Sequence, residues 1–541
     1  MKIKLLIVLF LSSISIFAQE DAWVFFNAKP NSAAFFTNPL TELTQRSLDR
    51  RTTQGIALDF KDAPIHQPYV DQVENTTGIT VLAQSKWLNM VHVQGLQIDI
   101  TALSVLPFVD HIQYAKHTLN PVVNPILTTG VTQKMSAYNK WQETQVNYNY
   151  GTSATQIQML NAHVLHQNDY TGAGKIVAIM DAGFPGVNTT APFQRLRDNG
   201  LILGGYDFVN NSNNFYTGYH HGTQVLSNMG GYADNQLVGT SPNAQYYLYI
   251  TEDVNNEAPI EESNWIEAAE QADRLGVDVI NTSLGYFIYD NPDYSYTYSQ
   301  MTGNVSVMSR SADIAFTRGM ICVTSAGNSD GSANPHIGAP ADAALNVTVG
   351  SVTSAEEKSG FSSIGPAFGG RIKPDLMAMG TASVVARQDG SIGTNNGTSF
   401  ASPILAGAIT SFWSAFPNKT NAEIVQFVKA SADRYSNPNN SYGYGIPDFQ
   451  LALNTALSTV KFNVNSFNIY PNPATSEITI SSQDTMMGSS IKFYNNLGQL
   501  VLEKNIDNQI QKISLQSLNS GVYYYNIASA EKTLFGKIIK N

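Results

Sequence analysis

Short apolar segments alternate with segments of helical periodicity between about residue 151 and residue 457. Strands joined through a helix run parallel, because the helix returns the chain to the same end of the sheet before the next strand begins. The pattern therefore predicts an α/β fold, with a parallel sheet, right-handed crossovers and helices on both faces. The expected strands are 176–180, 245–250, 278–282, 320–324 and 346–352, and the expected helices are 221–229, 260–275 and 305–318.

Chemically useful side chains occur where these elements begin or end. Asp181 follows the strand expected at 176–180, and Asn328 follows the strand expected at 320–324. In open α/β sheets, functional sites collect at the carboxyl ends of the strands. His221 begins an expected helix and supplies a candidate general base. Asp181 is a candidate for orienting that base, and the Asn328 side chain is a candidate N–H donor to an oxyanion.

The segment 397–403, Gly-Thr-Ser-Phe-Ala-Ser-Pro, precedes an apolar, Ala-rich helical run at 404–416. Thr398 and Ser399 are common helix-capping types and Pro403 suits a first turn, so we expect Ser399 at the very start of a helix. Developing negative charge is stabilised at that end of a helix. Ser399 is therefore a candidate nucleophile.

Four motifs follow one another in a diagnostic order. They are Asp-Ala-Gly at 181–183, His-Gly-Thr at 221–223, Ser-Ala-Gly-Asn at 325–328 and Gly-Thr-Ser-Phe-Ala-Ser-Pro at 397–403. Taken singly, each key residue is compatible with an ordinary turn, loop or cap residue. In this order, with these flanking residues, the motifs resemble those of the subtilisin-like serine peptidases.

The resemblance implies a mechanism for cleaving peptide bonds. Ser399 Oγ would attack the carbonyl, His221 would accept the proton and pass it to the leaving amine, and Asp181 would hold the imidazole in the productive tautomer. Asn328 and the Ser399 backbone N–H would stabilise the oxyanion.

Two further segments resemble the strands that flank the first specificity pocket in this family. An extended substrate would pair with such edges through main-chain hydrogen bonds. Neither segment contains an acidic residue, so we expect an apolar or broad preference rather than a strict requirement for Lys or Arg. The expected substrate-binding residues are Ser283, Leu284 and Gly285 in one segment and Ser325, Ala326 and Gly327 in the other.

The chain departs from the usual family pattern at several positions. Gln224 stands where a second histidine is common, and Ala182 stands where Ser or Thr is commoner. His220 is a rival base, but only His221 is followed by Gly-Thr. Tyr286 follows Gly285 where a second glycine is often found, so we expect its ring to narrow the cleft.

Composition limits the classes of partner. At 541 residues the chain is long enough for about three domains. Only 13% of its residues are charged and the net charge is −11, which argues against a nucleic-acid partner. Cys322 is the single cysteine, so an internal disulfide is excluded. Its apolar surroundings predict a buried hydrophobic residue rather than a nucleophile.

The amino-terminal residues predict export. Lys2 and Lys4 precede an apolar run at 5–17, and Ala18 is a plausible last residue before cleavage, so 1–18 is expected to be a signal peptide. The apolar run is too short to span a membrane comfortably, and we expect no transmembrane segment in the mature chain. Residues 19–140 predict an α+β domain without catalytic motifs, including a helix at 41–54.

In the resembling family, a domain in this position is usually an inhibitory propeptide that assists folding. A permanent binding domain is the alternative. The polar stretch at about 128–150 is the expected processing segment, and 141–457 is the expected peptidase domain.

The carboxyl-terminal region has a different character. After a linker at 458–466, residues 467–541 show β-type alternation and predict a small all-β sandwich. Tyr-Pro-Asn-Pro at 470–473, Tyr-Asn-Asn-Leu-Gly-Gln at 494–499, Leu-Asn-Ser-Gly-Val-Tyr at 518–523 and the basic end at 537–540 resemble a type IX secretion sorting domain. A sandwich that binds carbohydrate or the cell surface is the alternative.

No cofactor is expected to be required. The Asp- and Asn-rich loop at 207–214 has oxygen atoms compatible with calcium, although no specific motif supports a calcium site. No EF-hand spacing and no His/Cys cluster is present in the sequence.

Together these features predict a secreted serine endopeptidase that acts on protein or peptide substrates. It would be made as a zymogen and exported by the type IX machinery through the periplasm and outer membrane of a Gram-negative bacterium, to the medium or the cell surface. The alternatives are a catalytically inactive surface adhesin on the same scaffold and an esterase with the same triad.

Overall fold

The computed structural model describes residues 19–121, 147–457, 467–482, 489–495, 499–508, 510–528 and 533–541. The expected signal peptide at 1–18, the linker at 458–466 and most of the expected processing segment lie outside the described residues. The chain forms two compact units that divide after Ala456.

A seven-stranded sheet forms the centre of the first unit, with the order β13-β12-β11-β10-β5-β9-β6. Neighbouring strands all pair in parallel, which confirms the predicted α/β architecture. The strands are β5 (Ile176–Asp181), β6 (Ile202–Asp207), β9 (Gln245–Ile250), β10 (Val279–Thr282), β11 (Ile321–Ser325), β12 (Val347–Val352) and β13 (Leu376–Met379).

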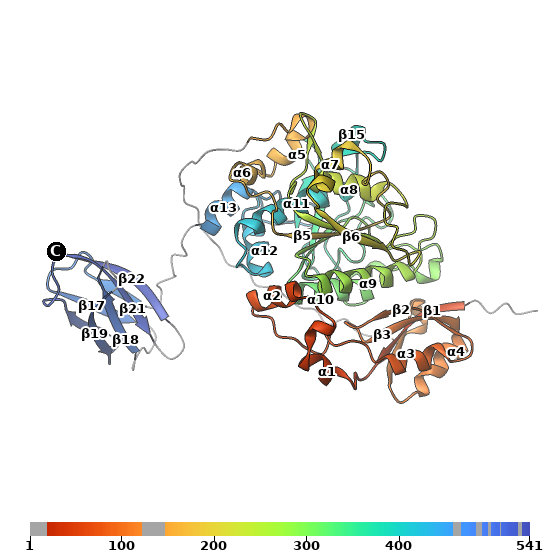
Figure 1. Ribbon diagram of the computed structural model, residues 1–541, viewed down its shortest axis with the longest axis horizontal. Helices are drawn as coiled ribbons and strands as arrows, with labels where there is room; N and C mark the ends of the chain where they lie inside the picture. Colours follow the sequence, from red (N-terminus) through yellow and green to blue (C-terminus); the bar gives the residue numbers. More distant parts are fainter. Residues whose placement is uncertain are drawn as a thin grey trace, which may run out of the picture. The chain divides into compact units, whose positions relative to one another are not determined.

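Helices cover both faces of this sheet (Figure 1). Side chains alternate along β5, so Val177 and Ile179 join one core while Ala178 and Met180 join the other. The first core includes α8 (His221–Gly230) and α11 (Thr398–Ala415), and the second includes α9 (Ile260–Leu275) and α10 (Val307–Thr317). Because both faces of the sheet are covered, its central strands β5, β10 and β11 are buried along their whole length.

The amino-terminal domain packs on the face covered by α9 and α10 (Figure 1). Its antiparallel sheet has the order β2-β3-β1-β4. Trp23 and Phe25 of β1 pack in the core that contains α9 and α10, whereas Val24 and Phe26 pack against the domain's own helices. The strands are β1 (Gln19–Phe26), β2 (Ile79–Ser85), β3 (Met90–Leu96) and β4 (Val109–Tyr114), and the helices are α1 (Ser32–Thr37), α2 (Gln45–Thr53), α3 (Gln67–Glu74) and α4 (Gln97–Ala102).

The helix expected at 41–54 is shorter than predicted. Residues 39–41 form a separate 3₁₀ turn, and α2 begins only at Gln45. Thr44 is the N-cap of α2, and its side chain accepts a hydrogen bond from the Ser47 N–H. The start of the helix is therefore set by this cap and not by the longer stretch of favourable helix formers.

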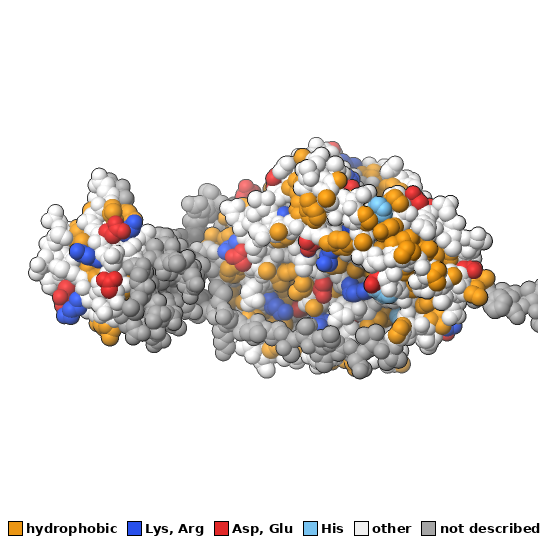
Figure 2. Space-filling view, turned by 90° about the horizontal axis from the view of Figure 1, so that it is seen from below, with side chains coloured by type: hydrophobic (Ala, Val, Ile, Leu, Met, Phe, Trp, Pro, Cys, Tyr) orange, Lys and Arg blue, Asp and Glu red, His pale blue; other side chains and the backbone are white. Residues whose placement is uncertain are grey.

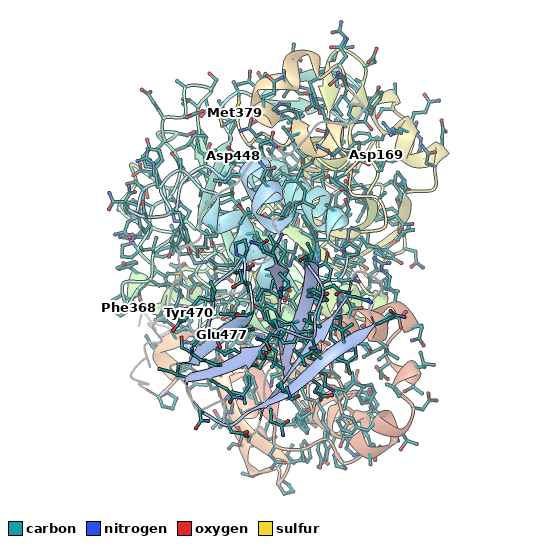
Figure 3. All side chains as sticks on the ribbon, turned by 90° about the vertical axis from the view of Figure 1, so that its left-hand side faces the viewer. Asp169, Phe368, Met379, Asp448, Tyr470 and Glu477 are labelled. Carbon is teal, nitrogen blue, oxygen red and sulfur yellow. The ribbon has the colours of Figure 1, made fainter. Side chains whose placement is uncertain are left out.

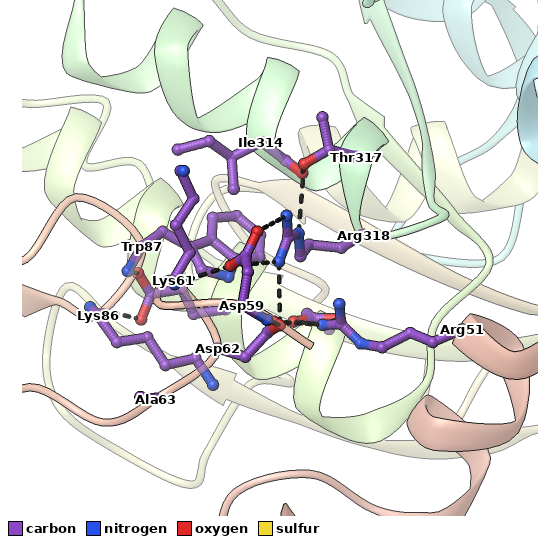
Figure 4. Close-up of polar contacts among 12 residues, drawn as sticks. Arg51, Asp59, Lys61, Asp62, Ala63, Lys86, Trp87, Ile314, Thr317 and Arg318 are labelled. Atoms are coloured by element: carbon purple, nitrogen blue, oxygen red, sulfur yellow. Dashed lines mark hydrogen bonds and ion pairs between the residues drawn. The ribbon is translucent and has the colours of Figure 1, made fainter. Parts of the chain in front are cut away.

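A buried ionic network joins the amino-terminal domain to α9 and α10 (Figure 4). Arg51 contacts both Asp273 of α9, at 2.7 Å, and Asp62, at 2.9 Å. Arg318, which follows α10, contacts Asp59 at 2.7 Å and Asp62 at 3.0 Å. Since Arg51, Asp62 and Asp273 are all buried, each charge depends on its partners across this interface.

Smaller elements complete the first unit. Two short antiparallel pairs, β7 (Tyr232–Ala233) with β8 (Leu237–Val238) and β14 (Ser383–Ala386) with β15 (Ile392–Asn395), lie outside the main sheet. The remaining helices are α5 (Ala154–Gln158), α6 (His163–Gln167), α7 (Gln194–Asp198), α12 (Asn421–Ala430) and α13 (Phe449–Leu457).

The second unit consists of two antiparallel sheets around one apolar core, as predicted. Tyr470 ends β16 and Glu477 begins β17 (Figure 3). Ile478 and Ile513 from one sheet share this core with Phe493 and Ile527 from the other. The first sheet contains β16 (Phe467–Tyr470), β17 (Glu477–Ser482) and β20 (Ile510–Ser514), and the second contains β18 (Ser489–Tyr494), β19 (Leu500–Ile506), β21 (Gly521–Ala528) and β22 (Thr533–Lys540).

The surface shows the low proportion of charged residues noted above. In the view of Figure 2, charged side chains are few and scattered among hydrophobic side chains and the white of the backbone and other side chains. Among the described residues, no helix is both long and apolar enough to cross a membrane.

Candidate active site

Asp181 is the last residue of β5 and is almost fully buried, with 1% of its surface exposed. Its Oδ1 atom accepts a hydrogen bond from the Ala182 N–H at 2.8 Å and lies 2.8 Å from His221 Nδ1. Its Oδ2 atom is buried and has no hydrogen-bond partner among the described residues. Ala182 has no hydroxyl group that could supply one. The carboxylate therefore makes its hydrogen bonds, including the one to the imidazole, through a single oxygen atom.

His221 is the first residue of α8, and the imidazole reaches back to the end of β5. Since Asp181 accepts at Nδ1, this nitrogen carries the proton and Nε2 is left as the basic atom. Burial opposes the charged form, but the Asp181 carboxylate, through its charge and its hydrogen bond, raises the pKa of His221 above its ordinary value, with a smaller contribution from the charge of Glu252. The side chain remains 26% exposed, so an incoming group can approach it.

The structure distinguishes the two candidate histidines. The His220 ring packs beside Tyr219, with 4.2 Å between the ring centroids. Within the described part of the chain, His220 makes no hydrogen bond to Asp181, whereas His221 does. Gln224 lies one turn further along α8, and its Oε1 atom accepts a hydrogen bond from Asn395 Nδ2 at 2.8 Å.

Ser399 is the second residue of α11, which confirms the expectation that it lies at the start of a helix, although neither Thr398 nor Ser399 is the N-cap. The N-cap is Gly397, whose φ of 150° lies in a region that side chains rarely adopt. The serine is placed in the first turn, where the backbone N–H groups have no partner four residues earlier in the helix and the helix dipole is positive.

Pro403 lies inside α11 and not in its first turn. Proline has no N–H to donate to the carbonyl four residues earlier, which is that of Ser399. The Ser283 hydroxyl donates to this carbonyl instead, at 2.9 Å. A side chain from the end of β10 thus replaces the missing helical hydrogen bond at the carbonyl group of the candidate nucleophile.

The Ser399 hydroxyl donates to the Ser283 carbonyl at 3.1 Å. Among the described residues, no hydrogen bond joins Ser399 to His221. The structure therefore brings Asp181 and His221 into direct contact, and it turns the Ser399 hydroxyl toward the predicted substrate-binding edge.

Asn328 follows β11 and is exposed. Its Oδ1 atom accepts from the Thr398 N–H at 2.9 Å and from the Thr398 hydroxyl at 3.0 Å. Two donors occupy the carbonyl end of the amide, and Nδ2 has no hydrogen-bond acceptor among the residues that the structure describes. This donor lies close to Gly397 and the start of α11.

The six expected substrate-binding residues lie at the ends of neighbouring strands. Ser283, Leu284 and Gly285 follow β10, while Ser325 ends β11 and is followed by Ala326 and Gly327. Gly285 is exposed and Leu284 and Gly327 are partly exposed, whereas the side chains of Ser283, Ser325 and Ala326 are buried.

The expectation that Tyr286 narrows the cleft is wrong. Its ring is 1% exposed and stacks on Tyr289, with the ring centroids 5.7 Å apart. Its backbone pairs with that of Ala339, through N–H···O distances of 2.7 and 2.9 Å. This pairing turns the ring away from the strand edge and into the core beneath it.

The loop proposed for calcium uses its oxygen atoms internally. Asp207 accepts hydrogen bonds from the backbone N–H groups of Val209 and Asn210 and from the Asn210 side chain, at 2.9 to 3.0 Å. No group of three or more His, Cys, Asp or Glu residues in the described ranges is arranged to hold a metal ion. The Asp207 carboxylate is therefore occupied by hydrogen bonds within its own loop. Cys322 is fully buried, and burial raises the pKa of its thiol.

Three family models match separate parts of the chain. A model described as "Subtilase family" matches residues 172–445. A model of the peptidase S8 propeptide domain of Bacteroidota matches residues 21–134, and a model of the secretion system C-terminal sorting domain matches residues 468–541.

Individual relatives are similar over between half and two thirds of the chain. Subtilisin NAT of Bacillus subtilis subsp. natto is 29% identical over 316 residues, which cover 58% of this chain and 74% of the relative. Subtilisin of Bacillus pumilus is 29% identical over 300 residues, which cover 55% of this chain and 97% of the relative. A solved structure of the MycP3 protease from the type VII (ESX-3) secretion system aligns at 20% identity over 62% of this chain and 98% of that chain, with a TM-score of 0.46.

Proposed function

Because the chain belongs to the subtilase family, we propose that it hydrolyses peptide bonds through an acyl-enzyme formed on Ser399. The family assignment makes it a subtilisin-like serine peptidase, and the individual roles of its residues are our proposal. The observation that carries it is the 2.8 Å contact between His221 Nδ1 and the buried Asp181 carboxylate, at the sheet edge where α11 presents Ser399.

In this mechanism, His221 Nε2 accepts the proton as Ser399 Oγ attacks the carbonyl carbon, and then donates it to the leaving amine. Rotation of the Ser399 hydroxyl away from the Ser283 carbonyl is required before attack. A catalytic hydrogen bond such as that from Ser399 Oγ to His221 is often long or poorly aligned in a free enzyme and tightens only once substrate is bound. Asp181 keeps the proton on Nδ1 and stabilises the imidazolium.

We assign stabilisation of the oxyanion to Asn328 Nδ2 and the Ser399 backbone N–H. The Thr398 backbone and hydroxyl hold the Asn328 amide by its oxygen, so its N–H group is oriented before substrate arrives. Donors fixed in advance stabilise developing charge without a cost of reorganisation in the transition state.

The flanking domains support a zymogen that is exported. The amino-terminal match to a peptidase propeptide supports residues 19–140 as an inhibitory domain that is removed after folding. The sorting-domain match indicates secretion or attachment to the cell surface. We propose export through the periplasm and outer membrane by a type IX route, with residues 467–541 as the signal.

A fluorophosphonate probe tests the proposal. We expect covalent labelling of Ser399 in the matured protein and none in Ser399→Ala, together with cleavage of a peptide substrate. A folded protein that is neither labelled nor active would support the adhesin alternative. Labelling with ester cleavage but no peptide cleavage would support the esterase.

A further inference from the structure

The segment that follows β9 is strongly acidic. Between residues 251 and 309 the sequence has eleven acidic residues and a single basic one, Arg274. Several of these carboxylates have partners: Asp273 pairs with Arg50 and Arg51, and Glu262 accepts from the hydroxyl groups of Tyr289, Tyr296 and Ser306.

Glu252 and Glu257 differ from these carboxylates. Neither forms an ion pair with a Lys or Arg side chain in the described part of the chain. Glu252 Oε2 is buried and has no hydrogen-bond partner among the described residues, although the side chain as a whole is partly exposed. A buried carboxylate oxygen without a partner is costly, and an incoming cation would remove that cost.

The sheet places Glu252 beside the catalytic pair. It lies two residues beyond the end of β9, and the preceding Thr251 N–H donates to the Asp181 carbonyl at 3.0 Å. Its carboxyl group interacts electrostatically with both Asp181 and His221. Glu252 is thus the acidic side chain that flanks the catalytic pair from the β9 side.

The order of the strands relates Glu252 to a substrate. The first specificity pocket is expected between the ends of β10 and β11, and the order β11-β10-β5-β9 puts Glu252 on the opposite side of β10. In an extended chain, successive side chains point to opposite sides. If the residue whose carbonyl is attacked (P1) enters the pocket, the residue before it (P2) points toward His221 and Glu252.

We propose that Glu252, assisted by Glu257, forms a subsite for a Lys or Arg side chain at P2 of the substrate. The inference rests on the proposed function. It does not change the preference expected at P1, which is apolar or broad because no acidic residue lies in the two segments that flank the P1 pocket. A charge-assisted hydrogen bond to a substrate cation in a partly buried site is worth about tenfold or more in relative rate.

The subsite should depend on pH. Burial first, then the charges of Glu257 and Asp181, raise the pKa of Glu252 to about 8, whereas His221 and the Tyr286 hydroxyl lower it. The facing groups are thus Asp181 on β5, His221 on α8, Glu257 before α9, Glu261 in α9 and Tyr286 after β10. At a pH below this raised pKa, the Glu252 carboxyl group is mostly protonated and must lose its proton before it can bind a cation. The preference for Lys should therefore strengthen as the pH rises from 6 to 9.

The test uses the full chain after its own maturation, with active enzyme counted by fluorophosphonate titration. The substrates are chromogenic peptides that share an apolar P1 residue and carry Lys, Arg, norleucine or Glu at P2. We expect kcat/KM for Lys and Arg to exceed that for norleucine at least tenfold at pH 8, with Glu the poorest. Glu252→Gln should bring the Lys-to-norleucine ratio within about threefold of unity, and Glu257→Gln should lower it partially.

Asp234→Asn is the matched control, because it removes one negative charge from the exposed turn between β7 and β8, beyond the far end of α8. It should keep the wild-type ratio. A wild-type ratio near one would overturn the proposal. So would a Glu252→Gln variant that slows both peptides equally, since that result indicates a structural role. Absence of both labelling and cleavage in the wild type would instead reject the proposed function.

Discussion

The carbonyl group of Ser399 has an unusual partner, and this contact links stability to the active site. Pro403 cannot donate to this carbonyl, and the Ser283 hydroxyl does so from the end of β10. We predict that Ser283→Ala lowers the free energy of unfolding by about 1–3 kcal/mol, because a buried acceptor loses its donor. Urea denaturation of the full chain measures the change.

Pro403→Ala supplies the control for this prediction. Alanine restores an N–H group four residues after Ser399, so the double variant should recover part of the stability lost in Ser283→Ala. Equal losses in the presence and absence of Pro403 would show that the two residues do not act on the same carbonyl.

The electrostatic surroundings of His221 predict the acid limb of activity. The pKa of His221 is raised, chiefly by Asp181 acting against burial, and catalysis requires the neutral imidazole. Activity is therefore lost as the pH falls through the raised pKa, and the midpoint of the acid limb of kcat/KM should lie above 6.5.

A pH series on a neutral peptide substrate measures this midpoint. Asp181→Asn should shift it to lower pH and should reduce kcat by about 10⁴-fold through loss of the correct tautomer. A wild-type midpoint well below 6.5 would contradict the assignment of His221 as the base.

At the scale of elements, the amino-terminal sheet and helices α9 and α10 are joined by buried ion pairs. Arg51 is 2% exposed and contacts both Asp62 and Asp273. Figure 4 shows its contact with Asp62. We predict that Arg51→Met weakens this interface by about 3 kcal/mol, because two buried carboxylates lose a shared partner. Urea denaturation in the Ser399→Ala background, where self-cleavage is excluded, measures the effect.

Arg46 is the matched control. It contacts the buried Asp278 at 2.7 Å, but its own side chain is 41% exposed, and Asp278 also pairs with Lys175 at 3.3 Å. Water screens such a pair, so Arg46→Met should cost less than about 1 kcal/mol. Similar losses in the two variants would mean that burial does not decide the strength of this interface.

At the scale of the whole molecule, the division after Ala456 separates the candidate site from the carboxyl-terminal sheets. Asp181, His221, Asn328 and Ser399 all belong to the first unit. We predict that a chain truncated after Leu457 retains peptidase activity after refolding but is not exported by the native cell. Export of the truncated chain, or loss of activity on a small chromogenic peptide despite a folded first unit, would contradict this.

Maturation provides a second prediction at this scale. If the enzyme cuts its own processing segment, Ser399→Ala should accumulate as the unprocessed chain, whereas the wild type should lose residues up to about 140. Electrophoresis and amino-terminal sequencing of the purified proteins distinguish the two. Normal processing of purified Ser399→Ala would show that another protease makes the cut.

Local patterns were sufficient for most of the architecture. The strand at 245–250 and the helix at 260–275 were predicted with the bounds that the structure has, since strand and helix periodicities are properties of neighbouring residues. The order of the motifs around Asp181, His221, Asn328 and Ser399 was likewise sufficient to predict the family. Neither required knowledge of which strands are neighbours.

Only the tertiary structure decided the contacts within the site. Glu252 lies far from His221 along the chain, and its place beside that histidine follows from the pairing of β5 with β9. The Tyr286 ring is buried because its backbone pairs with that of Ala339. The Ser399 carbonyl, which Pro403 cannot reach with an N–H group, accepts a hydrogen bond from the Ser283 hydroxyl. These contacts join residues from separate elements, and no local periodicity encodes them. They exist only because burial of apolar side chains holds the separate elements together, so that buried polar groups from different elements can pair.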